Sequence, residues 1–169
     1  IEKYDEWKDD PNIINDVMKF LDNVLSDFIN KAPDQFKDAK YSAERERSVG
    51  LGVMGFHSYL QKKKIPLESV MAKAWNKKIF KNIHQKVNQA SKDLAEERGA
   101  CPDAAEYGYQ ERFSNKTAIA PTASISIICG GASPGVEPIA ANSYTHKTLS
   151  GSFNVRNRYL EEILASHGK

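Results

Sequence analysis

Apolar residues recur at three- and four-residue spacing in two long stretches, the pattern of a helix that buries one face. The first stretch follows Asp10 and Pro11, which suit a helix cap and the first helical position, and we expect a helix of about 20 residues that ends before Pro33. Its apolar positions, expected on the buried face, are Ile13, Ile14, Val17, Phe20, Leu21, Val24, Leu25, Phe28 and Ile29. The second stretch predicts a helix over 68–98, with Gly99 as a left-handed cap. Its apolar positions are Met71, Ala74, Trp75, Ile79, Ile83, Val87, Ala90 and Leu94.

Shorter elements fill the remainder of the chain. Residues 33–47 are polar and charge-rich and are typical of a solvated loop, whereas the glycine-rich residues 48–55 suit a strand packed closely against other backbone. The other elements expected are a helix at 56–63, one helical turn near 100–103, a small buried strand at 117–120, a helix at 124–129, a loop at 132–138, a hairpin of 144–149 with 152–155 and a helix at 158–166. Strands interleaved with helices indicate an α/β arrangement, with too few strands to close a barrel alone.

Composition narrows the class of protein. The 169 residues are 40% hydrophobic and 27% charged with a net charge of +2, which favours a single globular domain over 1–169 and argues against bulk binding to nucleic acid or an anionic membrane. No apolar run reaches the roughly 20 residues that span a bilayer. Cys101 and Cys129 lie in no CxxC pattern, so we expect reduced thiols in a cytoplasmic protein. The chain starts at Ile1 without Met, and we expect a piece of a larger polypeptide.

Two glycine-rich segments resemble nucleotide-binding motifs only in part. Gly50, Gly52 and Gly55 match G-x-G-x-x-G, but no acidic residue follows at the end of a second strand, so close packing is the better explanation. The run 130–135 is followed by Val-Glu where a P-loop needs Lys and Ser or Thr. The histidines are scattered without metal-ligand spacing and predict no metal site; they are His57, His84, His146 and His167.

The segment Pro121–Ser126 carries hydroxyl groups at a predicted helix start. Unpaired amides and the positive end of a helix dipole can hold a phosphate there without any Lys or Arg, and Thr122, Ser124 and Ser126 could add hydroxyl groups. The same residue types also cap helices without binding any ligand. The residues alone leave both interpretations open.

Five separated blocks of the chain resemble, in order, the large catalytic subunit of class I ribonucleotide reductases. The blocks are Arg47–Phe56, Leu94–Pro102, Ala118–Ser126, Gly135–Pro138 and Asn142–Phe153. The similarity covers most of residues 11–165. It implies an α/β fold that is a partial segment of that family's ten-stranded α/β barrel, helix-rich with few short strands.

The resemblance also implies a chemistry. In that family a finger-loop cysteine becomes a thiyl radical, removes the 3′ hydrogen of a ribonucleotide and permits loss of the 2′ hydroxyl, while a cysteine pair supplies electrons. By resemblance, the residues that hold the substrate diphosphate are Pro121, Thr122, Ala123, Ser124 and Ile125. The implied partners are a ribonucleoside diphosphate, the remainder of the large subunit, a small subunit with its metal and radical centre, and a thiol reductant.

Several parts of the family pattern have no match in this sequence. The finger-loop block and the tyrosine pair that receives the radical are missing, and neither cysteine fits the radical or reducing positions; we expect Cys101 to pack and Cys129 to be a buried small side chain. We therefore expect no catalytic residue, metal or cofactor in this segment, and no turnover by it alone. The alternative is a non-catalytic helical interaction module in which Pro121–Ser126 is only a helix cap.

Overall fold

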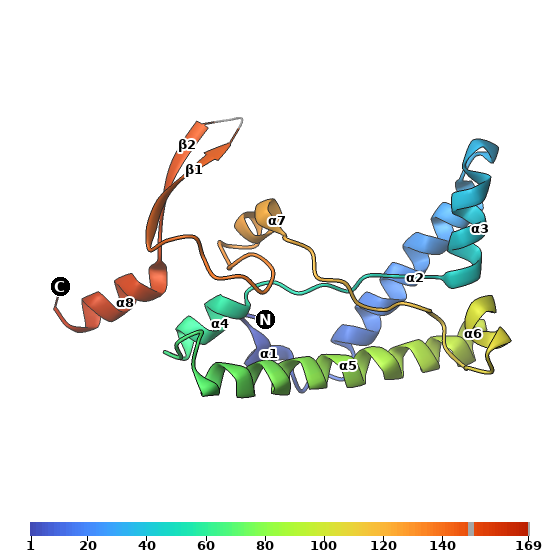
Figure 1. The fold of residues 1–169 in the computed structure, drawn as a ribbon, viewed down its shortest axis with the longest axis horizontal. Coiled ribbons are helices and arrows are strands. Elements are labelled where there is room, and N and C mark those ends of the chain that lie inside the picture. Colours follow the sequence, from blue (N-terminus) through green and yellow to red (C-terminus); the bar gives the residue numbers. More distant parts are fainter. Residues whose placement is uncertain (149–150, 169) are drawn as a thin grey trace. The chain divides into compact units, whose positions relative to one another are not determined.

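Helices make up most of the computed structural model, which describes residues 1–148 and 151–168 (Figure 1). In chain order the elements are α1 (Tyr4–Trp7), α2 (Ile13–Lys31), η1 (Asp34–Phe36), α3 (Lys37–Glu46), α4 (Phe56–Lys62), α5 (Val70–Arg98), α6 (Pro102–Glu106), α7 (Ala123–Ile128), β1 (Ser143–Thr148), β2 (Gly151–Arg156) and α8 (Arg158–Ser166). The chain divides into two compact units. Unit 1 comprises Ile1–Lys3, Val53–Ala74 and Ala120–Lys169, and unit 2 comprises Tyr4–Gly52 and Trp75–Ile119.

The predicted helices at 56–63, 124–129 and 158–166 are confirmed as α4, α7 and α8, each boundary within one residue. α5 begins two residues later than predicted because Ser69 caps it: the amide of Ala72 donates to Ser69 Oγ over 3.1 Å. Gly99 has the predicted left-handed conformation, with φ of 89°. The apolar stripe of α5 is buried from its second turn onward, at Ile79, Ile83, Val87, Ala90 and Leu94, whereas Met71 and Ala74 in the first turns are exposed.

The start predicted for the first long helix is wrong. Asp10 lies outside α2, where its Oδ1 accepts a hydrogen bond from the amide of Asn12 over 2.8 Å, and the helix begins at Ile13. Its apolar stripe is also only partly buried. Ile14, Met18 and Ile29 lie in the core of unit 2, but a second row on the adjoining face is exposed, namely Val17, Phe20, Val24 and Phe28. The apolar arc of α2 is wider than the face that its neighbours cover.

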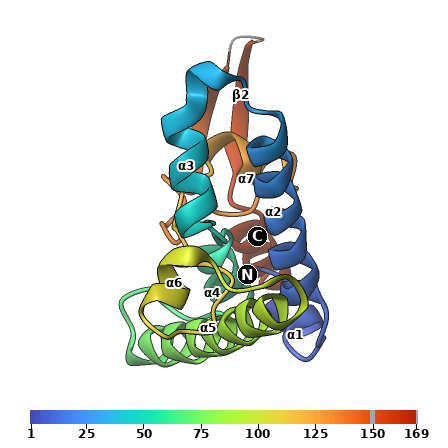
Figure 2. The same ribbon diagram turned by 90° about the vertical axis from the view of Figure 1, so that its right-hand side faces the viewer.

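The solvated loop predicted at 33–47 is instead helical, as η1 and α3. None of the α3 residues is buried, so no apolar stripe marks this helix in the sequence. α3 lies beside α2 (Figure 2). It is also tied to α6, because Arg45 pairs with Asp103 over 2.6 Å and with Glu106 over 2.7 Å.

The strands predicted at 48–55 and 117–120 do not form. Leu51 and Thr117 make a single parallel bridge, and residues 117–120 are exposed rather than buried. The close packing expected at the glycines is present, since a Cβ on Gly50 would lie 3.0 Å from the Ala118 Cβ. Three backbone hydrogen bonds link residues 49–51 to residues 115–118, which is too short a pairing for a regular strand.

The predicted hairpin is confirmed as the antiparallel pair β1 and β2 of unit 1, drawn in orange in Figure 1. Its register runs from Ser143 opposite Arg156 to Thr148 opposite Gly151. Leu149 and Ser150, which the prediction included, lie outside the described residues.

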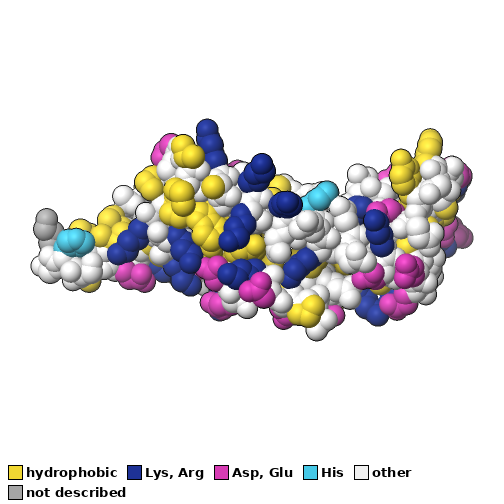
Figure 3. Space-filling model, turned by 90° about the horizontal axis from the view of Figure 1, so that it is seen from below, with side chains coloured by type: hydrophobic (Ala, Val, Ile, Leu, Met, Phe, Trp, Pro, Cys, Tyr) yellow, Lys and Arg dark blue, Asp and Glu magenta, His cyan; other side chains and the backbone are white. Residues whose placement is uncertain are grey.

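Basic and acidic side chains are interspersed on the face drawn in Figure 3, consistent with the small net charge of +2. Among the helices that the structure describes, none combines the length and the apolar character needed to cross a membrane.

Asp22 of α2 is a fully buried carboxylate that faces three arginines in unit 2. Its Oδ1 lies 2.6 Å from Arg47 Nη2 and 2.9 Å from Arg112 Nε, and its Oδ2 lies 2.8 Å from Arg98 Nη1. Burial acts to raise the pKa of Asp22, but the hydrogen bonds from the three arginines outweigh it and lower that pKa. The cluster joins α2 to the end of α3, the end of α5 and the segment that follows α6.

Replacing Asp22 with Asn should lower the free energy of unfolding of this chain by about 3 kcal/mol, because three guanidinium groups lose their shared counter-charge. Urea denaturation measures the change. The matched control is Asp27→Asn on the same helix, whose exposed pair with Lys31 is worth at most about 0.5 kcal/mol. Equal effects of the two substitutions would contradict a structural role for the Asp22 cluster.

Asp22 also predicts a loss of stability in acid. Since its pKa is lowered by folding, its contribution is complete above the ordinary value of 3.8 and is lost as the pH falls through the lowered pKa. Below pH 4 the free energy of unfolding should therefore fall more steeply for the wild-type chain than for Asp22→Asn. Parallel pH profiles would show that the carboxylate is not the titrating group.

Candidate functional site

The turn that enters α7 is built around a left-handed threonine. Thr122 has φ of 51° and ψ of 30°, a conformation that a β-branched residue adopts only when its surroundings hold it there. Its hydroxyl does not cap α7; Thr122 Oγ1 instead accepts a hydrogen bond from the amide of Gly135 over 2.8 Å. The interpretation of this loop as a simple hydroxyl cap is therefore wrong for Thr122.

The first-turn amides of α7 belong to Ala123, Ser124 and Ile125, and all three residues are exposed. The next amide, that of Ser126, donates to the carbonyl of Thr122 over 2.9 Å. Within the part of the chain that the structure describes, no acceptor is recorded for the three amides before it. The turn thus offers three backbone donors in succession at the positive end of a short helix.

Of the hydroxyl groups predicted to assist these amides, those of Thr122 and Ser124 keep a proton that a ligand could accept. Thr122 Oγ1 only accepts a hydrogen bond, from the amide of Gly135, whereas Ser126 Oγ donates its proton to the carbonyl of Ala123 over 3.1 Å. Ser126 is buried, whereas Ser124 is exposed in the first turn. Ser124 and Thr122 are therefore the side chains whose hydroxyl protons can join the amides in holding a ligand.

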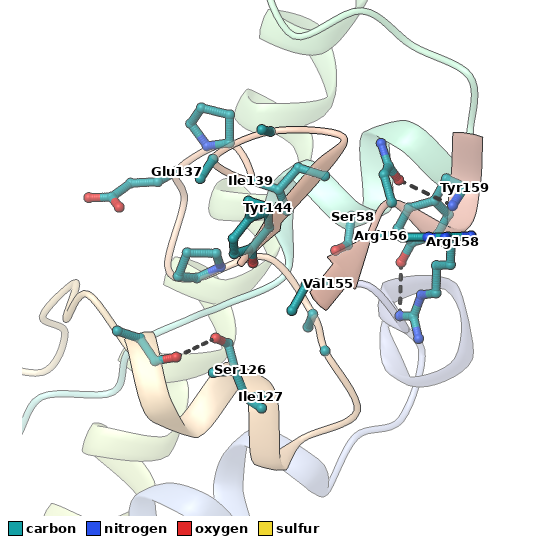
Figure 4. A pocket seen from close by; sticks show the side chains of 18 of the residues that line it. Ser58, Ser126, Ile127, Glu137, Ile139, Tyr144, Val155, Arg156, Arg158 and Tyr159 are labelled. Atoms are coloured by element: carbon teal, nitrogen blue, oxygen red, sulfur yellow. Dashed lines mark hydrogen bonds between the residues drawn. The ribbon is translucent and has the colours of Figure 1, made fainter. Parts of the chain in front are cut away.

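A cavity of about 770 Å³ lies next to α7 within unit 1, a size typical of small-molecule sites. Ser126 and Ile127 of α7 line it together with Tyr144 and Val155 from the hairpin (Figure 4). Much of the remaining wall comes from residues 130–141 and the start of α8. Among the five predicted site residues, Ala123 alone lines this cavity; the others lie in the turn beside it.

Contacts far apart in the sequence fix the segment 130–141. Arg158 at the start of α8 donates to the carbonyl of Gly130 over 3.0 Å and to Glu2 over 2.6 Å. Ser58 and His57 of α4 hydrogen-bond to Ser133 and to the amide of Ile139, respectively. The sequence motifs gave no sign of these roles, because Ser58 lies 75 positions from Ser133 and belongs to no motif of its own.

The two cysteines differ in their environment. Cys101 is buried at the start of α6, as expected for a packing residue. Cys129 was predicted to be buried, but it is exposed, because α7 ends there and the chain turns through Gly130 and Gly131 with positive φ. Among the residues described, no group of three or more His, Cys, Asp and Glu side chains could hold a metal ion.

Comparison with known proteins gives a consistent result. The family described as "Ribonucleotide reductase, barrel domain" matches residues 2–112 and 103–169. The ribonucleoside-diphosphate reductase large subunit of Invertebrate iridescent virus 6 is 49% identical over 165 residues, which cover 98% of this chain and 17% of the viral protein. The corresponding subunit of Invertebrate iridescent virus 3 is 45% identical over 164 residues, covering 97% of this chain and 26% of that protein.

A solved structure, the class Id ribonucleotide reductase alpha subunit of Actinobacillus ureae, superposes with a TM-score of 0.87 at 37% identity, covering 99% of this chain and 30% of that subunit. The chain thus spans less than a third of the length of these relatives. Its helix-rich fold with one hairpin is that of a partial segment of the larger barrel. The agreement of sequence blocks, family match and superposition over nearly the whole chain means that it belongs to the ribonucleotide reductase barrel-domain family.

Proposed function

We propose that this chain is a segment of the large subunit of a cytoplasmic ribonucleoside-diphosphate reductase and contributes the site that holds the substrate diphosphate. The complete enzyme reduces ribonucleotides to deoxyribonucleotides by radical chemistry. The observation that carries the proposal is the turn at Thr122, where the amides of Ala123, Ser124 and Ile125 have no acceptor among the residues that the structure describes. The free thiols Cys101 and Cys129 suit a reducing compartment.

The turn supplies the kind of donors that a diphosphate needs. Successive amides at a helix start point in similar directions, and each can make a charge-assisted hydrogen bond to a phosphate oxygen. Residues 117–130 contain no Lys or Arg, so the donors of the turn itself are backbone amides and the hydroxyls of Thr122 and Ser124, while Arg156 and Arg158 line the adjoining cavity. Such donors are fixed by the fold, so they need little reorganisation when the substrate binds.

The segment holds its ligand and leaves the chemistry to other parts of the enzyme. Cys101 is buried and Cys129 lies at the end of α7, and neither occurs in a block that matches the radical or reducing cysteines. We propose that the remainder of the large subunit supplies those cysteines and that a small subunit generates the radical. The described residues do not fit a metal centre, so we assign no metal-dependent step to them.

Replacing Ser124 with Pro should raise the KM for a ribonucleoside diphosphate about tenfold to a hundredfold in the complete large subunit, because one amide donor to a charged group is removed. Steady-state reduction assays measure the change. The control, Ser124→Ala, keeps the amide and removes only the hydroxyl, so its effect should be smaller. Binding of the matching nucleoside without phosphates should be the same in all three enzymes; an unchanged KM in Ser124→Pro would refute the site.

Replacing Thr122 with Val should also weaken diphosphate binding, since Val keeps the β-branch but leaves the amide of Gly135 without its acceptor. We expect a KM about three- to tenfold higher, while Thr122→Ser, which retains the hydroxyl, should stay close to the wild type. If Val and Ser variants behave alike, the Thr122 hydroxyl does not shape the turn.

A further inference from the structure

Two buried serines join α4 to the segment 133–139 within unit 1. The amide of Ser58 donates to Ser133 Oγ over 3.1 Å, and the amide of Ser133 donates to Ser58 Oγ over 2.8 Å. Both residues are 0% exposed. Each hydroxyl oxygen therefore accepts a hydrogen bond from the buried amide of the other serine. Loss of either hydroxyl leaves one buried amide without an acceptor.

The ring of His57, the residue before Ser58 in α4, holds the other end of the same segment. The amide of Ile139 donates to His57 Nδ1 over 3.1 Å. An imidazole nitrogen accepts a hydrogen bond only when it carries no proton, so this contact requires a neutral ring with its proton on Nε2. One short helix thus fixes the segment at Ser133 and at Ile139.

Between Ser133 and Ile139 the segment contacts the turn at Thr122, the proposed diphosphate site. Gly135 is buried, has φ of 45°, and donates its amide to Thr122 Oγ1 over 2.8 Å. The same segment forms the wall of the cavity at Pro134 and Ile139, next to Ala123 of α7. The position of Gly135 therefore determines whether its amide can donate to Thr122 Oγ1 and stabilise the left-handed conformation of Thr122.

We propose that His57 and Ser58 are positioning residues for substrate binding, which hold the segment 133–139 so that Gly135 fixes the turn at Thr122. The inference rests on the proposed function of that turn as the diphosphate site. Neither residue needs to contact the substrate; each acts through the segment and then through the Thr122 hydroxyl. A displaced segment would leave the amides of the turn misdirected.

Charged groups around His57 make this arrangement sensitive to pH. Glu68, in the connection between α4 and α5, favours the protonated ring, but burial outweighs it and the pKa of His57 lies below its ordinary value of 6.5. On α8, which packs against α4, Arg158 is paired with Glu2. Glu137 on the segment itself is exposed. The contact with Ile139 is therefore intact above pH 6.5 and is lost as the pH falls through the lowered pKa of His57.

Steady-state kinetics of the complete large subunit test the role of His57. His57→Ala should raise the KM for a ribonucleoside diphosphate about three- to tenfold with little change in kcat, as expected for the loss of one hydrogen bond. His57→Gln, whose side-chain oxygen can accept from Ile139, should recover most of the wild-type KM. His84→Ala is the control, since His84 is exposed on α5 and contacts Asn88. A Gln variant no better than Ala would overturn the proposed acceptor role.

A pH profile separates this role from simple packing. The ratio of wild-type KM to His57→Gln KM should rise as the pH falls through the pKa of His57, because Gln does not titrate. Titration of the substrate phosphates is common to both enzymes and cancels in the ratio. A ratio that stays constant between pH 8 and pH 5, about the range over which a histidine titrates, would overturn the role of the neutral ring.

The serine pair provides the second arm of the test. Ser58→Ala and Ser133→Ala should each raise KM, and the double variant should raise it by less than the product of the two single effects, because both hydrogen bonds hold the same point of the segment. Additive effects would overturn the reciprocal pair. If Ser124→Pro raises KM but the His57 and Ser58 variants do not, the positioning role fails alone; if Ser124→Pro has no effect, the proposed diphosphate site fails first.

Discussion

The buried carboxylate of Asp22 is the interaction on which unit 2 depends. It neutralises part of the charge of three arginines that lie 25, 76 and 90 positions away in the sequence. The parallel bridge joins Leu51 to Thr117. The two segments that contain these residues begin at Arg47 and Arg112, and both arginines pair with the carboxylate of Asp22. Removing such a carboxylate leaves uncompensated charges in a low-dielectric interior, which costs more than the loss of an exposed ion pair.

Unit 1 holds its candidate site mainly with neutral groups, beside the contact of Arg158 with the carbonyl of Gly130. Hydroxyl groups of Ser58 and Ser133, the ring of His57 and the hydroxyl of Thr122 each accept a hydrogen bond from a backbone amide. A neutral acceptor at Thr122 adds no negative charge to the turn itself, although the carboxylate of Glu137 lines the adjoining cavity. The electrostatic field at the turn then comes from the helix start, whose first amides have no acceptor among the described residues. The two units thus differ in the kind of polar contact that organises them.

The sequence predicted those elements whose signal is local. α5 follows a repeat of apolar residues, Gly99 ends α5 as expected, and the hairpin follows from two segments that bracket Ser150 and Gly151 in the sequence. α3 was missed because no residue in it is buried, and its stability comes from Arg45 contacts to a distant helix. The turn at Thr122 could be identified from its hydroxyl and amide chemistry. Its support by Ser58 and His57 could not, because it depends on residues about 75 positions or more from their partners.

Thr122 shows how strain and binding are connected in this turn. Glycine would adopt φ of 51° without cost, whereas threonine loses free energy there through its branched Cβ. The hydrogen bond that Thr122 Oγ1 accepts from Gly135 offsets this cost, and glycine could not make that bond. The turn is therefore held in one conformation, with the first amides of α7 already exposed. A donor set fixed before the ligand arrives binds with a smaller entropic loss than a flexible loop, so a strained threonine suits a binding turn better than a relaxed glycine.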